Sequence, residues 1–259
     1  MTQANTFSVI LGVATALVSG LVGSFALMKR MTLAGDVVSH LALPGLGLAF
    51  LWHINPLIGA AATLAIGIVL IDALQRRGGL ATETAIGVVF VAALAIGTLL
   101  TPQEDLIDAL FGGFGAIGVT GFSLGLAGCA VVLVTIYLIR HKLILIIFSS
   151  DLAQSVGIHV RRINFLYLAI FGLTILLGVH FLGALLVGAM IIVPAAVGRQ
   201  LARTLDSFLL ISSLAGMLSV GTGFAVAGIW HLALGPTIVG VASALFTLSL
   251  AAREKGSGL

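Results

Sequence analysis

The stretch GDVVSHLALPG, residues 35–45, places ionisable side chains and a proline within an apolar part of the chain. If it is helical, Asp36 and His40 are four residues apart and share one face, with their Cβ atoms about 5–6 Å apart. Pro44 has no backbone N–H, so we expect the carbonyl of His40 to be left free. Ionisable groups are costly at membrane depth, so an acid, an imidazole and a free carbonyl together indicate a functional site.

The donor atoms of Asp36 and His40 suit a particular class of metal ion. Carboxylate oxygen and imidazole nitrogen bind Zn²⁺, Mn²⁺ or Fe²⁺ better than Cu⁺, which prefers sulfur. A site for such ions wants about four to six donors, and this stretch supplies two. A two-fold homodimer with this helix at its axis would supply two aspartates and two histidines. The spacing also fits a structural interpretation, in which Asp36 caps the helix and His40 is buried beside a hydrogen-bonding neighbour.

The composition places the whole chain in a membrane. Of 259 residues, 60% are hydrophobic and 8% are charged, and the mean hydropathy is +1.25. Apolar runs of about 20 residues recur along the full length, which predicts an all-α, polytopic transmembrane bundle that forms a single domain over residues 1–259. The one cysteine, Cys129, excludes a disulfide within the chain and disfavours a thiolate metal cluster. The net charge of +3 comes from basic residues in short loops and does not indicate nucleic-acid binding.

The basic residues decide the expected topology. We expect nine spans, near residues 7–28, 36–52, 56–74, 81–100, 122–139, 163–179, 182–198, 207–228 and 235–251. With the N-terminus outside, all twelve lysines and arginines fall on one side: Lys29, Arg30, Arg76, Arg77, Arg140, Lys142, Arg161, Arg162, Arg199, Arg203, Arg253 and Lys255. The positive-inside rule makes that side cytoplasmic and places the C-terminus there. An arrangement of eight spans would break this agreement.

Several ionisable residues are expected on the outer side, at or between the ends of spans. They are His53, His180, His231, Glu104, Asp105 and Asp108. Together they would form a vestibule that attracts cations, although histidines at such positions also occur without binding metal. The neighbouring residues 106–120 are rich in glycine and are expected to form a short outer segment or a re-entrant turn, which needs protein to shield its backbone.

The longest polar stretch expected on the cytoplasmic side is residues 149–162. Polar residues at 149–151 are typical of a helix N-terminus, residues 152–156 can form a short helix, and Gly157 can end it. A helix of two turns is not stable alone, so it would need a partner surface. The alternative is a solvated loop.

A second proline is predicted to disturb a span. Pro194 interrupts the seventh expected span and frees the carbonyl of Met190, as Pro44 does in the second span. The expected consequence at both prolines is a kink in a packed helix.

Enzyme signatures are absent from the sequence. There is no GxxxxGK[ST] phosphate loop, so the chain does not bind ATP by that route, and there is no HExxH zinc motif of a metalloprotease. The ionisable groups expected within the membrane are too few for an obvious multi-step proton relay. We therefore expect a transport protein rather than an enzyme.

Six motifs in order along the chain resemble the membrane permease subunit of the metal-specific (zinc, manganese or iron) ABC importers. They are KRM at 29–31 with the stretch 35–45, ETAIGVVF at 83–90, DL at 105–106 with LFG at 110–112, the residues around Ser150, Asp151, Ala153 and Gly157, GALL at 183–186 with IVPAA at 192–196, and GPTIV at 235–239. Each motif alone is weak, but six in the same order are specific.

The resemblance implies a homodimer of this chain, bound to two copies of a separate cytoplasmic ATPase and supplied by an extracytoplasmic metal-binding protein. It implies that Asp36 and His40 of both protomers contact metal in the translocation path. The segment that couples to the ATPase would consist of Ser149, Ser150, Asp151, Leu152, Ala153, Gln154 and Gly157. No cofactor would be held permanently, Zn²⁺, Mn²⁺ or Fe²⁺ would be transported, and only the partner would bind ATP. The location would be the bacterial cytoplasmic membrane.

The expected function is therefore ATP-driven import of a divalent transition metal by alternating access. Two other functions stay open. A permease for an iron chelate, such as a siderophore or haem, would have a wide path and would not need the paired Asp36 and His40. A secondary metal transporter would work without any ATPase. The sequence does not choose among zinc, manganese and iron, because their ligand sets overlap.

Overall fold

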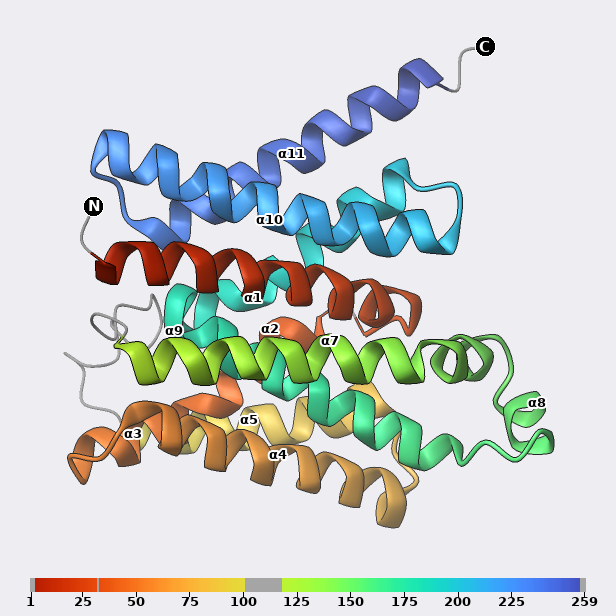
Figure 1. Ribbon diagram of the computed structural model, residues 1–259. Helices are drawn as coiled ribbons and strands as arrows, with labels where there is room; N and C mark the ends of the chain where they lie inside the picture. Colours follow the sequence, from red (N-terminus) through yellow and green to blue (C-terminus); the bar gives the residue numbers. More distant parts are fainter. Residues whose placement is uncertain (1–2, 32, 101–117, 257–259) are drawn as a thin grey trace.

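A computed structural model describes residues 3–31, 33–100 and 118–256. Within these residues the regular elements are all helices, which confirms the predicted all-α membrane fold. They are α1 (Gln3–Met28), α2 (Ala34–Ser39), the 3₁₀ turn η1 (His40–Ala42), α3 (Leu43–Leu51), α4 (Pro56–Gly78), α5 (Thr82–Leu100), α7 (Val119–Phe148), α8 (Ser150–Ser155), α9 (Val160–Leu201), α10 (Leu205–Trp230) and α11 (Leu234–Gly256). Figure 1 shows the long helices side by side in one bundle, with α8 at one end.

The expected spans correspond to helices in the described part of the chain. Eight segments are long and apolar enough to cross a membrane: Thr6–Met28, Ala34–Leu51, Pro56–Gly78, Thr82–Leu100, Val119–Phe148, Val160–Val179, Leu205–Trp230 and Leu234–Ala251. The remaining expected span, near 182–198, coincides with a shorter apolar segment, Leu186–Leu201. Figure 1 shows α1 beginning at one end of the bundle and α11 ending at the other. The chain therefore passes along the bundle an odd number of times, as a nine-pass topology requires.

Helix α9 contains a sharp reversal that separates two of these passes. A Cβ atom added at Gly178 would overlap the side chain of Val187. Nine residues of straight α-helix rise about 13 Å, so these two residues could not meet unless the chain folded back between them. The helix continues through Pro194 to Leu201, so this proline does not end it. The reversal lies before Pro194, and a kink at the proline itself stays a prediction.

The second expected span is broken where the sequence predicts, but one detail of that prediction is wrong. Helix α2 gives way to the 3₁₀ turn η1, and Pro44 lies in the first turn of α3. The carbonyl of His40 is not free, because it accepts a hydrogen bond from the backbone N–H of Leu43. In a 3₁₀ turn each carbonyl pairs three residues ahead rather than four, so the residue before the proline supplies the missing donor.

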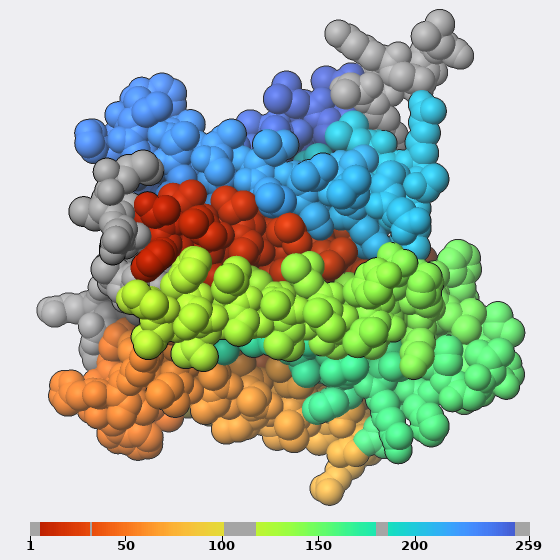
Figure 2. All heavy atoms as spheres, viewed as in Figure 1, coloured from red at the N-terminus to blue at the C-terminus, as the bar shows by residue number. Residues whose placement is uncertain are grey.

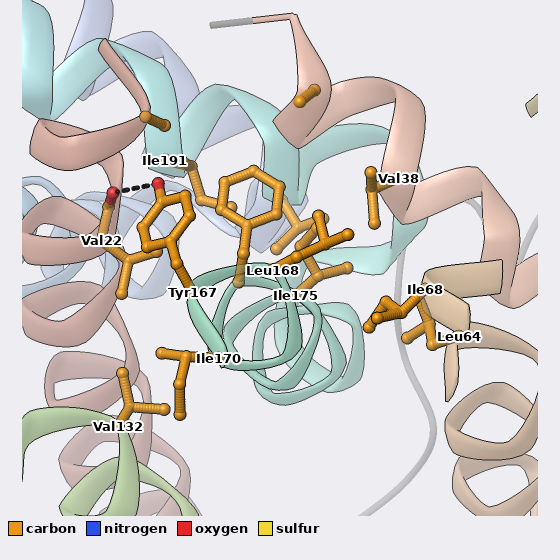
Figure 3. Close-up of a cluster of buried hydrophobic side chains, with 14 of the residues drawn as sticks. Val22, Val38, Leu64, Ile68, Val132, Tyr167, Leu168, Ile170, Ile175 and Ile191 are labelled. Carbon is orange, nitrogen blue, oxygen red and sulfur yellow. Dashed lines mark hydrogen bonds between the residues drawn. The ribbon is translucent and has the colours of Figure 1, made fainter. Parts of the chain in front are cut away.

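The core forms where α9 meets the other helices. Figure 3 shows aliphatic side chains of α1, α2, α4 and α7 gathered around α9, among them Val22, Val38, Leu64 and Val132. The hydroxyl of Tyr167, a fully buried residue of α9, donates a hydrogen bond of 3.1 Å to the carbonyl of Val22. Since helices in lipid gain little from the hydrophobic effect, this dense packing and the internal hydrogen bond hold α1 to α9.

The outer faces of the bundle are apolar. Figure 2 shows α7 across one face, with α1 and α10 on one side of it and α4 on the other. Large side chains such as Leu124 on α7 (73% exposed) and Leu99 on α5 (85% exposed) lie on the surface. Exposed leucines on helices of this length are expected to face lipid.

Candidate functional site

Close backbone packing holds the segment that carries Asp36 and His40. A Cβ atom added at Gly188 of α9 would come within 2.5 Å of the Asp36 Cα atom. On the other side of the break, a Cβ atom added at Gly45 would overlap the carbonyl oxygen of Gly59 on α4. Glycine lets helix backbones approach this closely. The segment Ala34–Leu51 is therefore fixed from both sides, by α9 and by α4.

Asp36 and His40 share one face, as their spacing predicts. The His40 Nε2 and Asp36 Oδ1 atoms are 4.0 Å apart. The His40 side chain is 12% exposed, and the Asp36 side chain is 52% exposed. The imidazole ring packs against Phe90 of α5, with ring centroids 5.6 Å apart. The His40 imidazole is thus held in place by packing, whereas the Asp36 carboxylate is open to the surface of the chain.

The structural interpretation of this pair is not supported. The N-cap residue of α2 is Leu33, and it makes no side-chain cap hydrogen bond, so Asp36 does not cap the helix. The buried Nδ1 atom of His40 has no hydrogen-bond partner among the residues that the structure describes. Buried polar atoms are normally paired, so an unpaired one calls for an explanation, such as a bound water or ion or a catalytic role.

The single chain does not complete a metal site. Among the described residues, no group of three or more His, Cys, Asp and Glu side chains is close enough to hold a metal ion. The segment offers the carboxylate of Asp36 and one imidazole from His40, which is fewer than a transition metal wants. Further donors would have to come from outside this part of the chain, on the side where Asp36 is exposed.

The expected outer vestibule is only partly within the described residues. His53 and His231 are both exposed, with φ angles of 53° and 52° at the ends of α3 and α10. Figure 1 shows the α3–α4 and α10–α11 connections at the same end of the bundle but on opposite sides. The two histidines therefore do not form one site within a single chain. Glu104, Asp105, Asp108 and the side chain of His180 lie outside the described residues.

The expected cytoplasmic helix is present as α8. It begins at Ser150, two residues before the expected start, and ends at Ser155, one residue before the expected end. The Ser149 hydroxyl oxygen accepts a hydrogen bond of 3.2 Å from the N–H of Leu152, and Gly157 follows the helix with φ at 81°. Both signals act as the sequence predicts, because serine satisfies a free N–H and glycine accepts the left-handed conformation.

Helix α8 presents apolar side chains outward. Ala153 is fully buried and seats the helix on the bundle, whereas Leu152 is 52% exposed and Val156 just beyond the helix is 61% exposed. Figure 1 shows α8 at the end of the bundle where α11 also ends. An exposed apolar surface on so short a helix is typical of a docking element.

A hollow of about 1830 Å³ opens beside α8, between the ends of α4, α5 and α9. In it, Asp72 of α4 forms ion pairs with Arg76 (3.1 Å) and with Arg161 at the start of α9 (3.8 Å). Sequence reasoning did not single out Asp72. The available signal was its position four residues before Arg76, which is the spacing of a helical ion pair.

Lys29 also lines this hollow and is held by two contacts. Its Nζ atom donates a hydrogen bond of 2.6 Å to the Asn164 side-chain oxygen and lies 5.0 Å from the centre of the Tyr167 ring. Burial lowers the pKa of Lys29 to about 8, because the charged ammonium loses solvation. The end of α1 is therefore tied to α9 through a cation that is only partly solvated.

Comparison with known proteins identifies the family. The profile of the ABC 3 transport family matches residues 2–253. The chain belongs to this family. The high-affinity zinc uptake system membrane protein ZnuB of Haemophilus influenzae is 30% identical over 253 residues, covering 96% of this chain and 97% of that protein. The manganese import system permease protein ScaB of Streptococcus parasanguinis is 32% identical over 246 residues, covering 93% and 88%.

Two solved structures share the fold of this chain. PsaBC from Streptococcus pneumoniae, solved in complex with a Fab, matches with a TM-score of 0.83 at 27% identity, covering 96% of this chain and 91% of that one. An inward-facing ABC transporter described as being of a metal-chelate type matches with a TM-score of 0.76 at 17% identity, which shows a shared fold alone. The protein is thus a multi-pass membrane permease of the ABC 3 family, and the resemblance found in its motifs is confirmed.

Proposed function

We propose that this chain is the homodimeric membrane subunit of an ATP-driven importer for divalent transition-metal ions. The single observation that carries the proposal is the Asp36–His40 pair, which lies within a membrane span with a half-exposed carboxylate and an unpaired imidazole nitrogen. Relatives named for zinc and manganese transport support the same class of substrate. Carboxylate and imidazole donors favour Zn²⁺, Mn²⁺ or Fe²⁺ over Cu⁺.

In this proposal two protomers meet where Asp36 is exposed. Each contributes one carboxylate and one imidazole, which gives the four donors that a single chain lacks. The site must bind weakly enough to release its ion, so only a few donors are expected. The N-terminus lies outside and the C-terminus lies in the cytoplasm, since the basic residues then all face inward.

The ATPase partner would dock on α8, through Leu152 and the apolar surface next to it. Movement of α8 would pass to the start of α9, which directly follows it, and to α4 through the ion pair between Arg161 and Asp72. Helix α4 contacts the turn that carries His40, because a Cβ atom added at Gly67 would overlap the side chain of Leu41. A rigid bundle with these contacts would transmit the motion to the metal path.

ATP-driven uptake into proteoliposomes tests the proposal. The chain would be reconstituted with its ATPase and its metal-binding protein, and uptake of zinc, manganese and iron(II) would be compared. We expect one or more of these ions to be imported, and the variant Asp36→Ala/His40→Ala to lose uptake. The control Asp206→Ala/His141→Ala removes the same residue types at the end of the bundle and is expected to keep it. Unchanged metal uptake in the Asp36→Ala/His40→Ala variant would overturn the assigned site.

Two further results would favour the other functions. Import of a siderophore or haem that survives the Asp36→Ala/His40→Ala change would indicate a chelate permease. Metal uptake that needs no ATPase would indicate a secondary transporter. Acidity offers an independent test, because protonated His40 does not bind metal. Uptake is expected to fall from about pH 7.5 to about pH 5.5, and a flat profile would count against His40 as a ligand.

A further inference from the structure

A second, smaller crevice lies between the ends of α1, α7, α9 and α10. Its volume is about 320 Å³. Its walls are apolar and include Met28, Ile144 and Phe208, and two arginines, Arg199 and Arg203, also line it. Figure 2 shows the region from outside, where the end of α7 approaches the α9–α10 connection. The crevice does not include the Asp36–His40 segment, and it adjoins the hollow beside α8, with which it shares Ile147.

The two arginines have no anionic partner in the described part of the chain. Arg199 lies in the last turn of α9, Arg203 lies in the connection to α10, and both are exposed. The nearest acid in the sequence is Asp206, whose side chain is 89% exposed and lies 3.9 Å from Arg140 instead. Two guanidinium groups at an apolar crevice therefore present a positive charge that no described carboxylate neutralises.

The position of the crevice decides which anion it can hold. Its lining includes Met28 and Phe208, which lie at the limits of their expected spans, so the crevice opens at the boundary of the membrane. Its arginines lie at the basic end of the bundle, where the headgroups of the inner leaflet are expected. An amphiphile with a negative headgroup and an alkyl chain matches both features at once, whereas a free phosphate ion would leave the apolar walls unused.

We propose that this crevice binds one anionic phospholipid, with its phosphate held by Arg199 and Arg203 and the start of an acyl chain lying against Met28 and Phe208. Guanidinium groups suit this role because they bind phosphate oxygens in a bidentate manner. The crevice also touches Phe148, the last residue of α7, and the N-cap of α8 follows immediately. A bound lipid would thus steady the point from which α8 leaves the bundle.

Lipid retention tests the binding directly. The full chain in complex with its ATPase would be placed in nanodiscs of mixed phosphatidylglycerol and phosphatidylcholine, and co-purifying lipid would be measured by native mass spectrometry. We expect a preference for phosphatidylglycerol of about thirtyfold, from two cations near the lipid surface. The variant Arg199→Gln/Arg203→Gln is expected to lose it. The control Arg77→Gln/Lys142→Gln removes two exposed cations at the same end and should keep it.

A second variant distinguishes binding of a lipid from binding of another anion. Ile144→Trp would fill the crevice while leaving both arginines in place, so it should also abolish retention of phosphatidylglycerol, and thermal unfolding would check that the variant is folded. Equal retention by the wild type and the double arginine variant would overturn the proposal. So would competition by millimolar inorganic phosphate, which would indicate a free-anion site, or retention only when the ATPase is absent, which would indicate an ATPase contact.

The effect on coupling rests on the proposed function, but lipid binding does not. If transport and ATP hydrolysis are measured in the same nanodiscs, phosphatidylglycerol is expected to raise the number of ions moved per ATP for the wild type and not for Arg199→Gln/Arg203→Gln. Lipid retention without this effect would leave the site intact and remove its role in coupling. Failure of metal transport in every lipid would instead contradict the proposed function.

Discussion

The segment Ala34–Leu51 and helix α8 are the two pieces of the chain to which we assign roles, yet different forces hold them. The first is pressed between α4 and α9 by glycine contacts at Gly45 and Gly188, and its α2 has no side-chain cap. The second is capped by Ser149, is followed by Gly157 in the left-handed conformation, and is seated by the single buried residue Ala153. The segment with the ionisable pair therefore takes its shape from its neighbours, whereas the ends of α8 are set by its own sequence and one buried residue seats it on the bundle.

This difference suits the two proposed roles. A metal site must keep its donors within a few tenths of an ångström, so rigid packing on both sides is an advantage. A docking helix must move with its partner, so it gains from local stability and few tertiary contacts. The same difference predicts that substitutions in the first region will mainly change the stability of the bundle, and that substitutions in α8 will mainly change binding of the ATPase.

The largest effect on stability is expected at the close contact between α3 and α4. Gly45→Ala places a methyl group against the Gly59 carbonyl, which is part of a helix and cannot move alone. Such overpacking costs about 1–3 kcal/mol or more, and the purified protein should unfold at a clearly lower temperature. The control is Gly87→Ala, because an added Cβ there meets nothing within 4 Å. Equal unfolding temperatures for the two variants would show that α3 is not fixed by packing.

A substitution on helix α8 should change stability little and partner binding strongly. Leu152→Glu changes an exposed side chain, so unfolding should move by no more than about 0.5 kcal/mol, while binding of the ATPase should weaken roughly tenfold. Binding would be measured by titrating the ATPase onto the permease in detergent. His141→Glu adds the same charge at an exposed position of α7 and should leave binding unchanged. A stable variant that still binds the ATPase normally would remove Leu152 from the docking surface.

The cap of α8 gives a smaller, local effect. Ser149→Ala removes the acceptor for the N–H of Leu152, at a cost of about 1 kcal/mol. Amide hydrogen exchange within residues 150–155 should become about fivefold faster, while the unfolding temperature of the bundle stays constant. Ser155→Ala serves as the control, since the Ser155 hydroxyl donates to the Leu152 carbonyl and caps no N–H. Identical exchange in both variants would mean that tertiary contacts hold α8 after all.

The smallest effect is expected where the two regions are linked. Asp72→Asn weakens the pairing with Arg76 and with Arg161, and partly exposed ion pairs contribute about 0.5 kcal/mol. The loss of stability should appear at low salt and vanish near 1 M salt, where charges are screened. Arg161→Gln in the Asp72→Asn background should not lower the free energy of unfolding further, because the carboxylate that pairs with Arg161 is already gone. Additive losses would show that the link between α4 and α9 does not depend on this pair.

Local signals were enough to predict much of this protein. Hydrophobic runs located the spans, the spacing of Asp36 and His40 placed them on one face, and Ser149 and Gly157 marked a short helix within two residues of its bounds. These features depend on residues that are near one another in the sequence, so they can be predicted from the sequence alone. The 3₁₀ pairing of the His40 carbonyl was missed because it depends on how the chain tightens around Pro44 under packing from both sides.

Contacts between distant residues could not be predicted in this way. The ion pair between Asp72 and Arg161 joins two helices 89 positions apart in the numbering. The reversal of α9 between Gly178 and Val187 was expected as a connection between two spans, but its tightness depends on a glycine that admits a neighbouring side chain. The crevice lined by Met28, Ile144, Arg199 and Phe208 draws on four helices and exists only once they are packed.

The sequence by itself determined that the chain is a helical membrane protein, because burial in lipid forces every apolar run into a helix and basic residues bias their loops to one side. Its six ordered motifs resembled the permease of metal importers. The tertiary structure decided which of its ionisable groups are free to act. Packing closes one side of His40, leaves Asp36 open, pairs Asp72 with two arginines and leaves Arg199 and Arg203 without described partners. The availability of a charge depends on which other groups lie within a few ångströms of it, and only the packed bundle sets those distances.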